Sequence, residues 1–296
     1  MKARIFNLRI KTLVYIYKFF TLFVLSVTSL IATQNVALAG ANLMVTPSRI
    51  VFEDRTRTAQ VTLLNTGDET GSFRIKFIRQ QMTKNGQFVE VKADEKGMFS
   101  DPMLRYSPRQ ISLPPGQSQV IRLMLRKPRN LEKGEYRSHL LFQSIPKSSK
   151  SGLESAIKSE QKGITVEIVP VVGISIPAIV RHGKLESSLT LDNARIIPAD
   201  DANPTARISV DMNRSGNQSV YGDFRAIFTP SDGGAPMTIA LVNGVAVYTP
   251  NALRKFSIPL RIPQGITLEN GNVRVIFLES GKDEKTGLIA ETNFSL

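Results

Sequence analysis

The chain has 296 residues, no cysteine and a formal net charge of +13 at pH 7. The absence of cysteine excludes a disulfide framework, a zinc–thiolate site and a cysteine nucleophile. The basic excess does not indicate a nucleic-acid partner, because the lysines and arginines are spread through strand-like segments and do not cluster with aromatic residues.

The first 39 residues follow the plan of a secretory signal. Five basic residues and no acidic one lie within residues 1–18, and the apolar run FFTLFVLSVTSLIA and then small residues follow. We expect cleavage after Ala39, with cleavage after Ala41 as the alternative. Removal of residues 1–39 leaves a net charge of +8 on a mature chain that is not embedded in a membrane. An uncleaved membrane anchor is the competing interpretation.

Short β-rich runs separated by turn residues fill the next hundred residues. The runs are LMVTPSRIVFE, RTAQVTLLN, GSFRIKFIRQ, QSQVIRLMLR and EYRSHLLFQS, with turn signals at Asn85-Gly86, Pro114-Pro115-Gly116 and Lys133-Gly134. Strands of this length and spacing predict an immunoglobulin-like sandwich. In the fourth run, Ile121, Leu123 and Leu125 alternate with more polar positions and should form its buried face.

Residues 163–180, GITVEIVPVVGISIPAIV, form an apolar ribbon with Glu167 as the only charged residue. Its prolines and β-branched side chains disfavour a helix and predict a strand. One period-2 face contains Ile164, Val166, Ile168, Val172, Ile174 and Ile176. The preceding segment KSSKSGLESAIKSEQK has few apolar residues, so we expect a flexible connection that lets the start of the ribbon lie at an exposed edge.

A second series of β-rich runs follows the ribbon. These are LESSLTL, TARISVDM, VYGDFRAIF, MTIALV, VAVYT, RKFSIPL, VRVIFLE and LIAETNF. The predicted fold class is therefore all-β, with two immunoglobulin-like β-sandwich domains. After the signal at 1–39, we place the N-terminal domain at 40–181 and the C-terminal domain at 182–296.

The sequence contains little that predicts catalysis or a metal site. His139 and His182 are the only histidines, and no carboxylate pattern marks either one as a base. Asp200, Asp201 and Asn203 lack an EF-hand register, so a solvated acidic turn is the better interpretation. Nucleotide-binding and hydrolase fingerprints are absent. We expect no enzymatic activity, no cofactor and no metal.

Three motifs together carry a resemblance to a known family. VTPSRIVFED near the mature N-terminus, then YSPRQISLPPGQSQVIRL and then GEYRSHLLFQSIP occur in this order before the polar segment and the apolar ribbon. Residues 41–183 are thereby similar to the N-terminal domain of the PapD-like periplasmic pilus chaperones. The second domain is similar to that family in length and strand content only.

This resemblance implies a function in the periplasm. Chaperones of this family lend the last strand of the first domain to a pilus subunit whose own sandwich lacks a strand, and they deliver the subunit to an outer-membrane usher. The donated side chains would be Ile164, Val166 and Ile168, while Val172, Ile174 and Ile176 would belong to the chaperone's own core. One possibility under this function is that the free protein covers its own donor strand by forming an oligomer.

The resemblance also implies a basic anchor for the subunit's terminal carboxylate. The family's strand-A arginine corresponds to Arg49, and a guanidinium suits a carboxylate because it donates charge-assisted hydrogen bonds. The family's second basic residue is expected at Gly173 or Ser175, where this chain has none. Arg181, Arg137 and Lys184 are the substitutes to consider. The alternative function is an exported two-domain structural or adhesive module that lends no strand.

Overall fold

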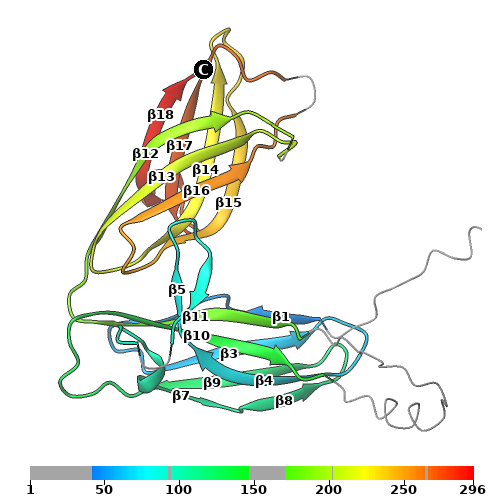
Figure 1. The fold of residues 1–296 in the computed structure, drawn as a ribbon, viewed down its shortest axis with the longest axis vertical. Coiled ribbons are helices and arrows are strands. Elements are labelled where there is room, and N and C mark those ends of the chain that lie inside the picture. Colours follow the sequence, from blue (N-terminus) through cyan, green and yellow to red (C-terminus); the bar gives the residue numbers. More distant parts are fainter. Residues whose placement is uncertain (1–41, 93–94, 147–170, 202, 264–265) are drawn as a thin grey trace, which may run out of the picture.

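The computed structural model describes residues 42–92, 95–146, 171–201, 203–263 and 266–296. Most of these residues lie in strands, which form two β-sandwiches whose long axes are roughly perpendicular (Figure 1). The predicted all-β, two-sandwich fold class is confirmed. The expected signal and the expected donor residues Ile164, Val166 and Ile168 lie outside the described residues, and their roles stay predictions.

The first sandwich contains every element from β1 to β11. Its elements are β1 (Leu43–Thr46), β2 (Ile50–Phe52), β3 (Thr58–Asn65), β4 (Gly71–Ile78), β5 (Gln80–Met82), β6 (Phe88–Glu90), the 3-10 helix η1 (Asp101–Met103), β7 (Leu104–Ser107), β8 (Gln110–Leu113), β9 (Ser118–Leu125), β10 (Gly134–Ser144) and β11 (Gly173–His182). One sheet has the order β1-β3-β9-β7, and the facing sheet has the order β2-β11-β10-β4-β8.

The run LMVTPSRIVFE, which we predicted as one strand, is two strands in different sheets. β1 pairs with β3 in the first sheet, whereas β2 pairs in parallel with β11 in the second. Pro47 lies between them and has no N–H with which to continue a ladder. This crossing places Arg49 at the start of β2, directly before Ile50.

The core between the two sheets follows the predicted alternation. Ile121, Leu123 and Leu125 of β9 are 0%, 1% and 4% exposed, whereas Met124 between them is 46% exposed. Phe52, Leu63, Leu140 and Phe142 are among the fully buried side chains that they meet. The predicted buried face of this strand is confirmed.

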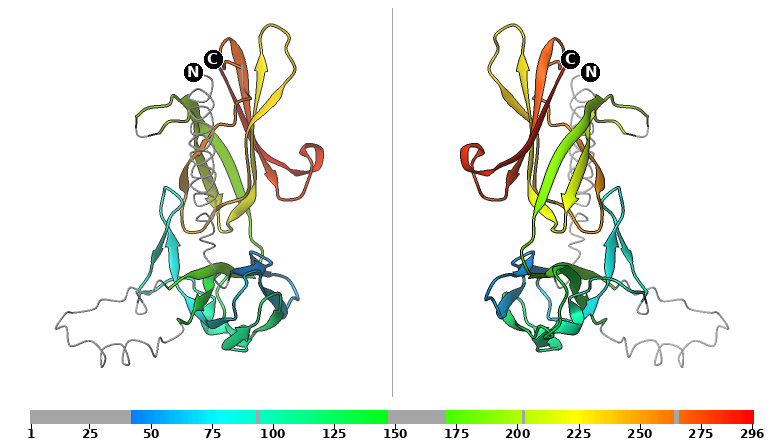
Figure 2. Two further views of the ribbon diagram at one scale, coloured as in Figure 1. Left: turned by 90° about the vertical axis from the view of Figure 1, so that its right-hand side faces the viewer. Right: turned by 90° about the vertical axis from the view of Figure 1, so that its left-hand side faces the viewer.

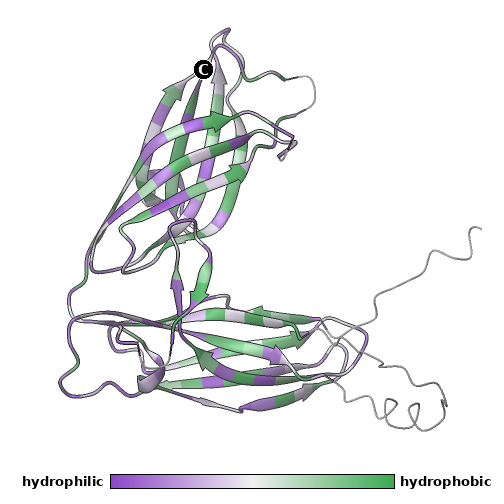
Figure 3. Cartoon of the chain, in the orientation of Figure 1, coloured by the Kyte–Doolittle hydropathy of each residue, from purple (hydrophilic) through white to green (hydrophobic). Residues whose placement is uncertain are grey.

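The second sandwich contains β12 to β18. Its elements are β12 (Ser187–Ile197), β13 (Arg207–Gly216), β14 (Val220–Pro230), β15 (Met237–Val247), β16 (Leu253–Pro259), β17 (Gly271–Glu279), the helix α3 (Glu284–Gly287) and β18 (Leu288–Ser295). The sheets have the orders β12-β13-β16 and β15-β14-β17-β18. Green and purple segments alternate along these strands in Figure 3, as expected for strands with one buried face.

Two expectations for the second sandwich are wrong. The runs MTIALV and VAVYT are one strand, β15, because the residues between them continue the pairing with β14 across a register shift opposite Gly222. Gly244, with φ +74°, supplies the backbone conformation that this irregularity needs. The short helix α3 was not expected, and Asp283 caps its start by accepting from the Thr286 amide (3.0 Å).

The hairpin formed by β5 and β6 extends from the first sandwich to the second (Figures 1 and 2). Its turn lies at the predicted Asn85-Gly86 signal, where Gly86 has φ +82° and a side chain would collide with the guanidinium of Arg254. The amide of Lys255 donates to the carbonyl of Lys84 (2.7 Å), and the Asn251 side chain donates to the carbonyl of Met82 (2.7 Å). The hairpin is therefore a brace between the two sandwiches.

Candidate functional site

The outer face of the β2-β11-β10-β4-β8 sheet turns toward the second sandwich and carries an unusual set of side chains. Strand register brings Val51 of β2 and Arg137 of β10 to either side of Ile179 on β11. One step along, His139 of β10 lies opposite Pro177 of β11. Arg49, which precedes β2, belongs to the same face. Polar and charged residues thus occupy a region that the second sandwich covers.

A small apolar cluster joins the two sandwiches at this face. Ile179 and Met82 come from the first sandwich, and Ala246 and Tyr248 come from the second; all four are at most 5% exposed. Val51 and Tyr221 pack at its border. The two tyrosines present their rings to the arginines of the outer face, which positions both guanidinium groups at the domain junction.

Arg49 is only partly exposed and lies at this junction. Its guanidinium carbon is 4.2 Å from the centroid of the Tyr221 ring, a cation–π geometry. Its Nε and Nη1 are buried without a hydrogen-bond partner among the described residues. Burial lowers the pKa of Arg49, and the nearby charge of Arg181 adds to this effect. The group is a desolvated cation with unused donors, which favours binding of an anion.

An open cleft of about 540 Å³ adjoins Arg49. Arg181, Gln218, Tyr221 and Ile289 are among its other lining residues, so both sandwiches contribute to it. The predicted anchor Arg49 and the alternative Arg181 therefore line the same cleft. The cleft combines these two cations with apolar side chains and the carboxylate of Glu279.

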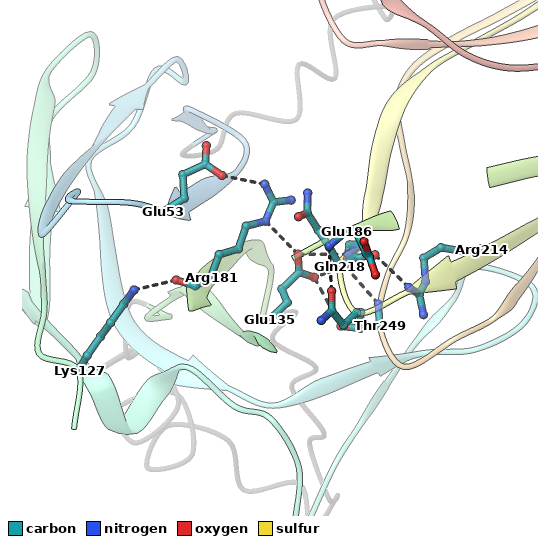
Figure 4. Close-up of polar contacts among 10 residues, drawn as sticks. Glu53, Lys127, Glu135, Arg181, Glu186, Arg214, Gln218 and Thr249 are labelled. Carbon is teal, nitrogen blue, oxygen red and sulfur yellow. Dashed lines mark hydrogen bonds and ion pairs between the residues drawn. The ribbon is translucent and has the colours of Figure 1, made fainter. Parts of the chain in front are cut away.

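Arg181 differs from Arg49 because its charge is already paired. Its Nε donates to Oε2 of Glu135 (3.1 Å), and its Nη1 donates to Oε2 of Glu53 (2.9 Å) (Figure 4). Lys127 Nζ also donates to the Arg181 carbonyl oxygen (2.7 Å). A second carboxylate on Arg181 would compete with these ion pairs. Arg49 is the better candidate anchor.

Glu135 of β10, which pairs with Arg181, also connects the first sandwich to the second through hydrogen bonds. Its side chain is fully buried and accepts from the amide of Ser219 (3.2 Å), from the Ser219 hydroxyl and from the Thr249 hydroxyl (3.4 Å). Figure 4 shows this carboxylate between Arg181 and Thr249. The network fixes the wall of the cleft in which Arg49 lies.

The edge of β11 is only partly used. β10 pairs with β11 along Gly173–His182, whereas β2 pairs with its other edge only from Ala178 to Val180. No other described strand pairs with that edge from Gly173 to Pro177. The backbone groups of this stretch that point to the free edge are therefore unpaired by any described strand, which makes the edge a template for an added strand.

The apolar row of β11 becomes uncovered toward the same end. Val180 and Ala178 are fully buried, Ile176 is 3% exposed and Ile174 is partly buried. Val172, which precedes the strand, is 67% exposed. Our expectation that Val172 belongs to the core is wrong, because Val172 precedes β11 and does not pack in the core cluster; Ile176 is in the core as expected.

The remaining polar candidates have no described ligand-binding arrangement. His139 is 2% exposed, and its ring packs edge-on against Phe88 with centroids 4.9 Å apart. Oδ1 of Asp200 accepts from the amide of Asn203 (2.6 Å) in an exposed turn. The described residues contain no cluster of His, Cys, Asp or Glu suited to a metal ion, and no described helix has the length and apolar character of a membrane span. The absence of enzymatic activity stays a prediction.

No family model and no curated protein matches the chain. Solved structures do match, and three of them are the YadV chaperone (12% identity, TM-score 0.42, covering 86% of this chain and 99% of that chain), the class 5 fimbriae chaperone CfaA (18%, 0.37, 85% and 99%) and the Pseudomonas aeruginosa CupB2 chaperone (12%, 0.39, 86% and 100%). The chain resembles fimbrial chaperones. These matched structures are fimbrial chaperones, the same kind of protein that the sequence motifs resemble, and the residues proposed to bind a partner are inferred below from this chain's own geometry.

Several residues of the junction were not identified from the sequence. Glu135, Tyr221 and Tyr248 form the contacts just described, but they come from strands whose alternation alone gives no sign of a partner in the other sandwich. Arg137 was considered only as a substitute anchor. The one sequence signal for the hairpin was its Asn85-Gly86 turn.

Proposed function

We propose that this protein binds secreted β-sandwich proteins of the pilus-subunit type that lack a strand, and that it holds them by strand addition along β11. In this proposal Ile164, Val166 and Ile168 fill the groove of the incomplete sandwich, and Arg49 binds the partner's terminal carboxylate. The protein acts in the periplasm and delivers the partner to an outer-membrane usher.

The observation that carries the proposal is the unpaired edge of β11, which ends at Arg49. β2 runs parallel to β11 and begins at Ile50, beside Ala178. A partner strand added in the same direction along Gly173–Pro177, roughly 16 Å of edge, would have its carboxyl end where β2 begins. That position lies next to Arg49, the desolvated cation with unused donors.

Burial of the donated side chains supplies the affinity in this proposal. Each aliphatic side chain that leaves water contributes roughly 1.5–3 kcal/mol before the costs of association are subtracted. Val172 lies between the donated residues and β11 in the sequence, and it is 67% exposed. Its exposure fits a ribbon in which only the residues after Val172 pack in the protein's own core. The Arg49 contact then fixes the register, because only one alignment brings the terminal carboxylate to the guanidinium.

Site-specific photo-crosslinking tests the proposed strand addition. A photoreactive amino acid at Ser175, which is exposed on the open stretch of β11, should crosslink to a small secreted β-protein in periplasmic extracts. The same group at Gln60, exposed on β3 of the opposite sheet, should not. Failure to capture any such partner under conditions of pilus expression would instead favour an exported structural or adhesive module.

Val166→Asp tests the donated residues. A carboxylate at this position would be buried without a partner in the apolar groove, which costs several kcal/mol. Binding of the captured subunit should be lost, while the circular dichroism melt of the free protein stays that of the wild type. A melt lowered together with binding would show that Val166 is an ordinary core residue.

Arg49→Ala tests the carboxylate anchor. Loss of the stack on Tyr221 should cost about 1 kcal/mol of unfolding free energy, whereas affinity for the subunit should fall about tenfold or more because hydrogen bonds to charged groups are strong. Arg122→Ala, an exposed arginine on β9, is the matched control. A subunit extended by one residue at its C-terminus should bind wild type and Arg49→Ala equally; unchanged affinity of Arg49→Ala for the native subunit removes Arg49 from the site.

A further inference from the structure

A second cavity lies at the domain junction and shares no lining residue with the Arg49 cleft. It has a volume of about 330 Å³ and is enclosed by the β5–β6 hairpin, residues 95–99 and the turn that follows β15. Gln80, Val91, Met98, Phe99, Arg137 and Pro250 are among its lining residues. Arg49 does not line this cavity, and Arg137 does not line the other. The two arginines therefore belong to separate spaces.

Arg137 is the buried charged group of this cavity, whereas Glu95 and Lys96, which also line it, are exposed. Arg137 is 6% exposed, and its guanidinium carbon is 4.1 Å from the centroid of the Tyr248 ring. Nη2 makes one long hydrogen bond to the carbonyl of Gln80 (3.5 Å), while Nε and Nη1 have no partner among the described residues. Burial lowers the pKa of Arg137 to about 10. The cation has lost most of its water without gaining an ion pair.

Arg79 and Arg214 show what a satisfied arginine looks like in this protein, whereas Arg137, like Arg49, keeps two buried donor nitrogens without a partner among the described residues. Arg79 forms two hydrogen bonds with Asp101, both 3.0 Å. Arg214 donates to the carbonyls of Asn251, Gly216 and Gln218 at 2.8–2.9 Å. A buried charge without such partners is costly, so a protein that retains one gains from an anion that binds there.

An unsatisfied acceptor lies beside this unsatisfied donor. Oε1 of Gln80 is buried without a hydrogen-bond partner among the described residues, and Gln80 lines the same cavity as Arg137. Val91, Met98 and Phe99 provide apolar walls. A ligand that complements all three features carries a negative group, an N–H or O–H donor near it, and an apolar part.

We propose that this cavity is a carboxylate-binding site, independent of Arg49, in which Arg137 binds the carboxylate and Gln80 accepts from a neighbouring donor of the ligand. A single negative charge fits better than a phosphate, because the described lining residues carry the cations Arg137 and Lys96 and the carboxylate Glu95, which together leave one net positive charge. An acidic side chain of a bound peptide and a small free organic acid share this chemistry. The site does not depend on strand addition and is tested with the free protein.

Two probes and their neutral counterparts distinguish these sources. N-acetyl-glutamate N-methylamide represents an acidic side chain of a peptide, and 2-hydroxy-3-methylbutanoate represents a small apolar acid with an O–H donor; the glutamine analogue and 2-hydroxy-3-methylbutanamide are the neutral controls. Calorimetric titration of the full chain measures affinity. Side-chain Nε–Hε resonances of ¹⁵N-arginine-labelled wild type report which arginine the probe contacts, without relying on the folding of any variant.

We expect at least one acid to bind and to shift the Arg137 resonance, and both amides to bind about tenfold or more weakly. Arg137→Met should lose this binding, whereas Arg49→Met should retain it. Tighter binding of the peptide probe assigns the site to an acidic protein segment, and tighter binding of 2-hydroxy-3-methylbutanoate assigns it to a small acid. The proposal is overturned if neither acid shifts the Arg137 resonance, or if Arg137→Met binds the acids as wild type does; Arg137 would then serve only to stack on Tyr248.

Discussion

The two faces of the β2-β11-β10-β4-β8 sheet are built from the same strands but differ in how their side chains are satisfied. The inner face presents Ile176, Ala178 and Val180 of β11 to an apolar core that excludes water. The outer face carries Arg137 and His139 of β10, whose side chains are just as buried but have polar atoms without partners in the described part of the chain.

This difference separates folding from binding within one sheet. Apolar burial on the inner face lowers the free energy of the folded state and needs no ligand. Buried polar groups without partners raise that free energy, so they are retained where a partner or ligand satisfies them. The outer face is therefore the side on which changes should affect binding and pH dependence more than folding.

A charge on the inner face should produce the largest effect. Ile176 is 3% exposed between the two sheets, and Ile176→Asp would bury a carboxylate without a partner. We expect a loss of about 4 kcal/mol or more in unfolding free energy, enough to leave the first sandwich unfolded. Far-UV circular dichroism and thermal melts measure this loss.

Val172→Asp is the matched control on the same row of β11 side chains. Val172 is 67% exposed, so an aspartate there stays hydrated and should change the unfolding free energy by about 0.5 kcal/mol or less. Similar destabilisation by both substitutions would mean that the core extends to Val172. The comparison thus locates the point at which the row leaves the sandwich.

The outer face should give the protein a pH dependence through His139. Burial, with a further contribution from the charge of Arg137, lowers the pKa of His139 from 6.5 to about 3. Between these two values the unfolded chain binds a proton that the folded chain does not, so stability decreases as the pH falls through this window. From pH 7 to pH 5 the loss should be about 2 kcal/mol.

His139→Leu isolates this contribution. The substitution removes the titrating group and keeps an apolar side chain beside Phe88, so the variant should lose about 2 kcal/mol less than wild type over the same pH range. Urea unfolding at pH 7 and at pH 5 measures both differences. Parallel pH profiles for the two proteins would show that His139 remains accessible to protons in the folded state.

The sequence predicted the inner face better than the outer face, for a physical reason. Ile121, Leu123 and Leu125 were identified because side chains alternate between the faces of a strand, and that periodicity is local. The contacts of Arg49 with Tyr221 and of Arg137 with Tyr248 join residues more than a hundred positions apart. No local period records such a pairing.

The errors along the chain have equally local causes. Asn243-Gly244 has the composition of a turn, yet β15 passes through it because pairing with β14 resumes after the register shift. Val172 continues the apolar alternation of Ile174 and Ile176, but it precedes β11 and does not pack in the core cluster. Arg49 was identified only through its motif, since an arginine beside a strand is otherwise ordinary.

The smallest effect is expected at the hairpin that braces the junction. Asn251→Ala removes the hydrogen bond from the Asn251 side chain to the carbonyl of Met82 and should cost about 1 kcal/mol of unfolding free energy. Because the hairpin also contacts the second sandwich through Lys84, the brace should loosen without being lost.

Asn193→Ala, an exposed asparagine whose side chain donates to Asp211 within the second sandwich, is the control. Small-angle scattering should give a broader distribution of distances between the sandwiches for Asn251→Ala than for Asn193→Ala. Identical scattering curves would mean that the apolar cluster around Tyr248 and the Glu135 network hold the two sandwiches in place without this contact.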